Sequence, residues 1–167
     1  SLENYFLLNT NLISISNDDD NDGMLNPGES ATLHLLLENP SLMLTAETID
    51  ISISTSAPID IIESEYEIEE PINIGENIII DIPISVDTDI DLGDVIFDVL
   101  ITADYTDLYG DQYTYDANFP IVVDIGLNQA NWPVSIGSQI RSSPAVIDIN
   151  DDGDKENIFG DYSGLLH

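Results

Sequence analysis

The sequence has almost no positive charge. Its 167 residues include 33 acidic side chains and only two basic ones, Arg141 and Lys155, so the formal net charge is −31. Proteins hold nucleic-acid phosphates with clusters of lysine and arginine, and anionic lipid surfaces attract the same residues. The composition therefore excludes a nucleic-acid-binding protein and argues against attachment to an anionic membrane surface.

Cysteine is absent as well. The chain consequently has no disulfide bond, no thiolate metal ligand and no cysteine nucleophile. It also lacks an apolar run of the roughly 18 residues that a membrane-spanning helix needs, and residues 1–4 do not begin a signal peptide. We therefore expect no insertion into a membrane.

The excess of acidic residues is best tolerated in a solvent that is rich in cations. Mobile cations in a salty or calcium-rich exterior screen the repulsion between carboxylates. We therefore predict a secreted or cell-surface location. A biased genomic composition is the alternative explanation for the same residues.

Apolar side chains are nevertheless abundant, and they alternate along the chain. Hydrophobic residues make up 43% of the sequence, enough to build a core in spite of the charge. They recur at every second position, which is typical of half-buried β-strands. Pro83, within one of these runs, predicts an edge strand, because proline has no amide hydrogen to donate to a neighbour. The alternating runs lie at residues 12–16, 32–38, 49–54, 78–86, 95–105 and 113–125.

Short alternating strands separated by turn residues predict an all-β chain folded as an antiparallel Ig-like β-sandwich. The pattern changes after Gly126, where the alternation fades. Three further short strands follow, the first two on either side of an acidic loop and the third from residue 165, and they are too few for a core of their own. We therefore predict a sandwich over residues 1–126, and a linker with a C-terminal β-hairpin over residues 127–167.

An acidic loop between the first two predicted strands has the spacing of a calcium site. Its aspartates alternate as at positions 1, 3 and 5 of a twelve-residue calcium loop, and Gly23 occupies the sharp-turn position. Calcium prefers about six to eight carboxylate and carbonyl oxygens. An acidic solvated loop is the alternative. The predicted ligands are Asp18, Asp20, Asp22, Met24 through its carbonyl, and Glu29.

A second acidic loop repeats the pattern near the end of the chain. Acidic or amide side chains again alternate before a glycine, Gly153, and the closing glutamate comes three residues earlier than in the first loop. We predict a second calcium site here, with a charged turn as the alternative. The predicted ligands are Asp148, Asn150, Asp152, Asp154 and Glu156.

Catalytic motifs are not evident. His34 falls on the polar face of its strand, as a surface residue does, and His167 is the last residue. The sequence has no Gly-x-Ser-x-Gly motif for a nucleophilic serine and no glycine-rich loop for phosphate. We therefore expect the chain not to be an enzyme.

Two other functions stay open. Aromatic residues near one another in sequence are candidates for a surface on which sugar rings stack, which would make the chain a carbohydrate-binding accessory module. Unpaired edges of the short C-terminal strands are templates for pairing with other copies, as in a strand-exchanging extracellular filament. The aromatic candidates are Tyr105, Tyr109, Tyr113, Tyr115 and Trp132.

Two stretches resemble known families. Residues 21–33, with 37–39, resemble the opening of CARDB-like and other Ig-like β-sandwich modules of secreted bacterial proteins. Residues 132–134 and 141–165 resemble the first FG-GAP or VCBS-type repeat of integrin-like propellers. The second resemblance implies calcium binding by the acids of residues 148–156 and a partial propeller blade at the C-terminus.

Taken together, these features predict a non-catalytic, calcium-binding structural or adhesion module of a secreted or cell-surface bacterial protein. Its expected cofactor is Ca²⁺. Its expected partners are further domains of a parent chain or other copies of itself, with polysaccharide as the alternative.

Overall fold

The computed structural model describes residues 6–127, 136–150 and 156–167. The chain divides into two compact units, Ser1–Ala130 and Asn131–His167. All regular secondary structure in the described residues is β, and none of them forms a helix able to cross a membrane. The predicted all-β fold class is confirmed.

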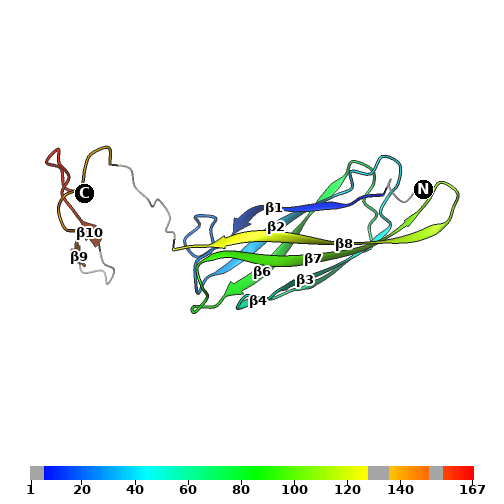
Figure 1. Ribbon diagram of the computed structural model, residues 1–167, viewed down its shortest axis with the longest axis horizontal. Helices are drawn as coiled ribbons and strands as arrows, with labels where there is room; N and C mark the ends of the chain where they lie inside the picture. The colour runs from blue at the N-terminus through cyan, green and yellow to red at the C-terminus, as the bar shows by residue number, and fades with distance from the viewer. Residues whose placement is uncertain (1–5, 128–135, 151–155) are drawn as a thin grey trace. The chain divides into compact units, whose positions relative to one another are not determined.

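The first unit is a sandwich of two four-stranded antiparallel sheets (Figure 1). Its strands are β1 Asn9–Ser16, β2 Ser30–Glu38, β3 Thr48–Thr55, β4 Ile59–Ile61, β5 Glu65–Ile68, β6 Asn77–Val86, β7 Gly93–Thr106 and β8 Gln112–Ile125. One sheet has the order β1–β2–β6–β4 and the other β5–β3–β7–β8. This division of strands between two sheets is that of an Ig-like sandwich.

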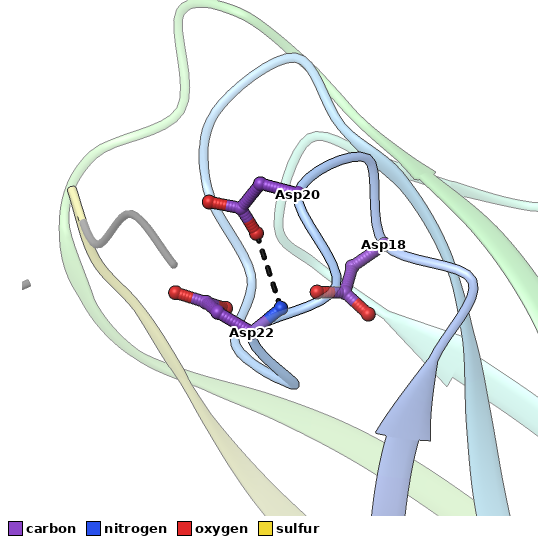
Figure 2. A group of neighbouring side chains, drawn as sticks. All are labelled: Asp18, Asp20 and Asp22. Atoms are coloured by element: carbon purple, nitrogen blue, oxygen red, sulfur yellow. Dashed lines mark hydrogen bonds between the residues drawn. The ribbon is translucent and has the colours of Figure 1, made fainter. Parts of the chain in front are cut away.

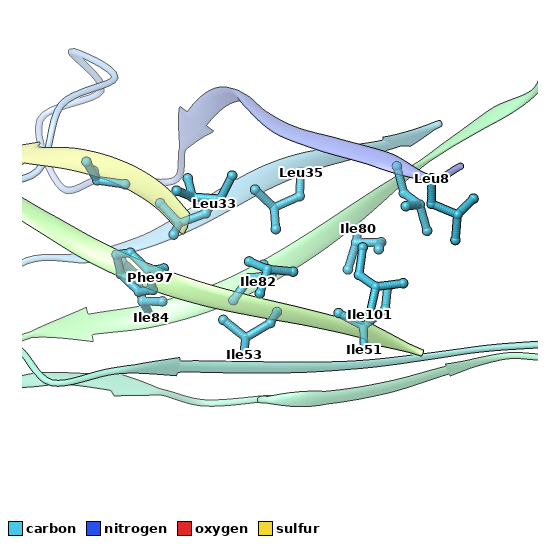
Figure 3. Packing of buried hydrophobic residues seen from close by; sticks show 14 of the residues in the cluster. Leu8, Leu33, Leu35, Ile51, Ile53, Ile80, Ile82, Ile84, Phe97 and Ile101 are labelled. Carbon is cyan, nitrogen blue, oxygen red and sulfur yellow. The ribbon is translucent and has the colours of Figure 1, made fainter. Parts of the chain in front are cut away.

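Alternation along the strands builds the core between the sheets (Figure 3). Leu35 of β2, Ile82 of β6, Ile51 of β3 and Phe97 of β7 are each at most 2% exposed. Burial of one such side chain stabilises the fold by about 1.5–3 kcal/mol. A register slip of one residue would expose a whole row of them, so the core fixes the strand register.

Pro83 lies in an internal strand, so the predicted edge position is wrong. β6 runs between β2 and β4, and Pro83 pairs with Thr32 of β2. The Pro83 carbonyl accepts a hydrogen bond from the Ile62 amide at 2.9 Å. In an antiparallel strand the amide and carbonyl of one residue point the same way, so the missing N–H faces β4. The missing N–H is on the side of Ile62, just past the end of β4 at Ile61, so the proline limits the length of that edge strand. The pairing of β6 with β2 is intact.

The second unit contains an antiparallel hairpin of β9 (Ala145–Ile147) and β10 (Glu156–Ile158). Isolated bridges join Ile140 to Asp161 and Gly160 to Leu166. Within residues 136–150 and 156–167 no hydrophobic side chain is buried. The pairing of this unit therefore depends on turns and backbone hydrogen bonds more than on a core.

Candidate functional site

The loop that connects β1 to β2 is the first predicted calcium loop. Its backbone reverses sharply, because Asn17 and Asn21 have positive φ angles of 55° and 57° and Gly23 has one of 78°. Asparagine and glycine adopt this left-handed conformation at lower cost than other residues. The Asn21 amide also donates to the Asp18 carbonyl at 3.2 Å. The sequence thus folds into a compact turn along which aspartates alternate.

Three aspartates of this turn come together (Figure 2). One carboxylate oxygen from each of Asp18, Asp20 and Asp22 lies within 4.8 Å of the others. Oxygens that share one Ca²⁺ at about 2.3–2.6 Å are separated by no more than roughly 5 Å, so a single ion can contact all three. Among the described residues, no other set of three or more acidic or histidine side chains has this geometry.

Backbone amides hold the three carboxylates in place. Asp18 Oδ2 accepts a hydrogen bond from the Gly23 amide at 2.9 Å. Asp22 Oδ1 accepts one from the Met24 amide at 2.8 Å, and Asp20 Oδ1 accepts one from the Asp22 amide at 3.3 Å. Asp18 is only 4% exposed, whereas the other two aspartates are half-buried. The turn therefore preorganises the cluster, with one carboxylate at its base and two nearer the solvent.

The sequence of residues 1–130, which includes this cluster, contains no lysine or arginine. Arg141 and Lys155, the basic residues of the chain, both belong to the second unit. Carboxylates a few ångströms apart repel one another, and a buried carboxylate is costly without an opposite charge or hydrogen bonds. A bound cation would offset this repulsion.

Glu29 and Met24, the other two predicted ligands, lie differently. Glu29 Oε2 accepts a hydrogen bond from the Asn26 amide at 2.9 Å, and Oε1 accepts one from Asn26 Nδ2 at 3.1 Å. Glu29 is buried and is not part of the aspartate cluster. The Met24 side chain is exposed, and its amide is bound to Asp22. The glutamate therefore stabilises the turn that leads into β2.

The second half of the loop is tied to both sheets. Leu25 is fully buried, forms a bridge with Ile125 at the end of β8, and accepts a hydrogen bond from the Gly126 amide at 2.9 Å. The Glu29 carbonyl accepts one from the Val86 amide, at the end of β6, at 2.7 Å. Since β8 and β6 belong to different sheets, order in this loop is coupled to the closure of one end of the sandwich.

The second predicted calcium loop lies between β9 and β10. Asp152 and Asp154 lie outside the described residues. Asp148 is half-buried and Asn150 is exposed. A Glu156 carboxylate oxygen accepts a hydrogen bond from the Ile149 amide at 2.8 Å. The described part of this loop brings together no cluster of three ligands.

The aromatic residues considered for sugar binding differ in exposure. Tyr105 is buried and stacks on Phe6 with ring centroids 4.2 Å apart. Tyr113 is 43% exposed and stacks on Tyr105 at 5.6 Å. Tyr109 is exposed at the β7–β8 turn, and Trp132 lies outside the described residues. Tyr113 therefore continues a stack of rings outward from the core.

One chain of polar contacts could not be anticipated from the motifs. His34 Nε2 lies 2.7 Å from the Ser16 hydroxyl oxygen, and His34 Nδ1 lies 2.6 Å from Asp81 Oδ1. The three residues come from β1, β2 and β6. Alternation puts each of them on a polar face, but only the strand register brings them side by side.

Comparison with known proteins shows no family for this chain. No family model matches the chain, and no curated protein matches it. Among solved structures, an ASH or PapD-like domain of human CEP192, its PapD-like domain 7, is similar. The match has 13% sequence identity, covers 75% of this chain and 87% of that domain, and has a TM-score of 0.36.

The family resemblances drawn from the sequence are therefore corrected. Neither a CARDB-like module nor an FG-GAP or VCBS-type repeat is found by these comparisons. The motifs behind both resemblances are short acidic turns with glycine. Such turns recur wherever a chain must reverse between strands, so they specify a local conformation more than a family.

Proposed function

We propose that this chain is a calcium-stabilised structural module of a secreted or cell-surface protein, with Ca²⁺ bound by the turn between β1 and β2. The observation that carries the proposal is the convergence of the Asp18, Asp20 and Asp22 carboxylate oxygens within 4.8 Å. The ion neutralises the aspartates and orders their loop. Its role is structural, and no reaction is assigned to it.

The ligand chemistry favours calcium over other metals. The turn offers hard oxygen ligands, whereas zinc and copper prefer imidazole or sulfur. Magnesium demands octahedral geometry and keeps several waters, while calcium accepts about six to eight oxygens in a flexible arrangement. Three aspartates on one short turn, completed by a backbone carbonyl such as that of Met24 and by water, suit the larger ion.

Binding in this turn stabilises the sandwich through mass action. An ion that binds the folded turn but not the unfolded chain adds about 2.7 kcal/mol at a free concentration one hundred times its dissociation constant. The stabilisation reaches both sheets, because Leu25 of the same loop bridges to Ile125 of β8. Bound calcium therefore stabilises the packing of the two sheets at this end of the module.

The proposed location follows from the same chemistry. Extracellular calcium modules bind with dissociation constants of roughly 0.1–1 mM, and dissolved cations also screen a net charge of −31. In adhesion, such a module would hold further domains of a parent chain at a fixed spacing. The β9–β10 loop is proposed as a second site of the same kind, with Asp148 and Glu156 among its ligands.

Thermal unfolding with and without calcium tests the proposal. We expect the melting temperature to rise by several degrees in calcium relative to chelator, and the Asp18→Asn/Asp22→Asn variant to lose that rise. The matched control is Asp89→Asn/Asp91→Asn, which removes the same charge from another alternating acidic loop that forms no cluster among the described residues. An equal response in both double variants would contradict the proposal, because it would reflect general screening of charge.

Carbohydrate binding is a second candidate, supported by one observation. A groove of about 360 Å³ is lined by Tyr113 together with Tyr105, Gln112, Asp104 and Glu47. An exposed ring beside amide and carboxylate groups is the combination that sugar sites use. On a glycan array, we expect Tyr113→Ala to abolish any binding and Tyr109→Ala, at the exposed turn, to leave it unchanged.

A further inference from the structure

A Ser–His–Asp chain of hydrogen bonds crosses the outer face of the sheet formed by β1, β2 and β6. The Ser16 hydroxyl oxygen lies 2.7 Å from His34 Nε2, and Asp81 Oδ1 lies 2.6 Å from His34 Nδ1. The order of contacts, with serine on Nε2 and aspartate on Nδ1, is that of the charge-assisted triads of serine hydrolases.

Strand register fixes this chain. His34 of β2 is paired with Asp81 of β6 on one side and with Ser14 of β1 on the other. Ser16 comes two residues after Ser14, so its side chain is on the same face of the sheet. Three hydrogen-bonded strands thus hold the three side chains, which is a more rigid support than loops provide.

The hydrogen-bond pattern determines the direction of proton transfer. An ionised Asp81 only accepts hydrogen bonds, so His34 Nδ1 carries the hydrogen between them. In the neutral imidazole Nε2 is then an acceptor, and the Ser16 hydroxyl donates to it. His34 is therefore placed as a general base for Ser16, as nucleophilic catalysis requires.

We propose that Ser16 is an activated nucleophile that takes up acyl groups from small uncharged esters, with His34 as the general base and Asp81 as a positioning residue. Uncharged esters are the substrate class because a net charge of −31 repels anions. The face is open to water, since the side chain of His34 is 20% exposed and that of Asp81 is 66% exposed. The proposal goes beyond the calcium-binding role, and it departs from our sequence-based expectation that the chain is not an enzyme.

The reaction balances with the ester and water alone. Ser16 Oγ bonds to the ester carbonyl carbon while its proton moves to His34 Nε2. The carbon–oxygen bond to the alcohol then breaks, and the departing alkoxide takes the proton from His34. Water then attacks the acyl-serine carbonyl carbon and gives up a proton to His34. The bond between that carbon and Ser16 Oγ breaks, His34 returns the proton to Ser16 Oγ, and the carboxylic acid is released.

The developing negative charge needs a hydrogen-bond donor, and the residue after Ser16 is the one proposed for that role. In α/β-hydrolases the backbone N–H of that residue donates to the oxyanion. Here it is Asn17, which adopts a positive φ of 55° at the end of β1 and donates its side-chain amide to Thr32 Oγ1 at 3.2 Å. The left-handed turn at Asn17 reorients the backbone directly after Ser16.

Covalent labelling with a fluorophosphonate probe, followed by peptide mass spectrometry, tests the proposal. Fluorophosphonates phosphonylate a serine only when a base activates it and fluoride leaves. We expect an adduct on Ser16 in the intact chain and no adduct in Ser16→Ala. His34→Gln and Asp81→Asn should each slow labelling by roughly a hundredfold, the contribution of a positioned base.

Ser14→Ala is the matched control, since Ser14 lies on the same strand directly opposite His34. It should label Ser16 at the rate of the unaltered chain, and Asp81→Glu should recover part of the rate lost in Asp81→Asn. Melting temperatures of all variants separate loss of reactivity from loss of folding. The proposal is overturned if Ser16 takes up no probe in the folded chain, or if a folded His34→Gln variant labels it equally fast.

Discussion

The Gly23 amide donates to Asp18 Oδ2 at 2.9 Å, across the turn that carries all three clustered aspartates. Asp18 is 4% exposed, so this bond satisfies a buried carboxylate as well as closing the turn. The bond therefore contributes to the shape of the turn independently of the charge that an ion would neutralise. The contribution of Asp18 to stability divides into a structural part and a charge part.

Two substitutions at Asp18 separate these parts. In chelator, Asp18→Ala should lower the free energy of unfolding by about 1–3 kcal/mol, because it leaves the Gly23 amide without its acceptor. Asp18→Asn keeps an acceptor oxygen and removes the repulsion, so its stability in chelator should match or exceed that of the unaltered chain. Urea denaturation measures both. Equal losses in the two variants would show that the hydrogen bond does not hold the turn.

Glu29 gives the sharpest contrast between the spacing and the structure. The calcium-loop pattern assigns it to the ion, whereas both of its oxygens accept hydrogen bonds from Asn26. We expect Glu29→Gln to lower the melting temperature in chelator but to keep the rise that calcium produces. Differential scanning calorimetry measures both melting temperatures. Loss of the rise with calcium in Glu29→Gln would show that Glu29 is a ligand.

Tyr66 links the two sheets at the β5 edge. Its hydroxyl lies 2.9 Å from the Asp81 carbonyl oxygen and 3.0 Å from that of Glu63. Burial, followed by the nearby charges of Glu63 and Asp81, raises the pKa of Tyr66 from 10.0 to about 12. Since the folded state favours the neutral phenol, this contribution to stability is present below pH 10 and is lost between pH 10 and 12.

Absorbance at the phenolate band checks this pKa. At pH 11 the folded chain should show Tyr66 still protonated, and Tyr66→Phe should remove that late-titrating group. The phenylalanine variant should also lose about 1 kcal/mol of stability at neutral pH, the net value of one hydrogen bond. A Tyr66 phenolate already formed at pH 11 would contradict the prediction.

Asp161 organises the last turn of the chain. The Ser163 hydroxyl, the Leu165 amide, His167 and the Ser163 amide all donate to its carboxylate, and these bonds lower its pKa well below the ordinary 3.8. Stability from a depressed carboxyl pKa is present above the unfolded value and is lost as the pH falls through the folded one. Carbon-detected NMR should therefore find Asp161 ionised at pH 3, and Ser163→Ala should raise its pKa toward 3.8. An unshifted titration would contradict this role.

Much of the fold was accessible from the sequence because burial and alternation are coupled. In a strand with one buried face, apolar side chains must recur at every second residue. Residues such as Leu33, Leu35 and Ile82 therefore predict the strands in which they lie. The short strands β4 and β5 carry too few residues for a period to show. The prediction of an edge position for Pro83 was wrong because an internal strand can also tolerate a missing amide. The amide is not needed where the neighbouring strand, here β4, has already ended.

The candidate sites were predictable from the sequence only where their residues are close together along the chain. Asp18, Asp20 and Asp22 converge because their spacing and the turn at Gly23 are local, and sequence reports local geometry well. Glu29 stays a predicted ligand, and the structure adds that each of its oxygens accepts a hydrogen bond from Asn26. Ser16 and Asp81 are separated by about half of the sandwich sequence, and only pairing between strands brings them to His34.

Calorimetric titration of the metal-free chain with calcium tests the central claim most directly. We expect a saturable binding event that disappears in the Asp18→Asn/Asp20→Asn/Asp22→Asn variant and persists in Asp89→Asn/Asp91→Asn. A second event that survives the triple variant would belong to the β9–β10 loop. The claim is contradicted if the unaltered chain and the triple variant give the same heats.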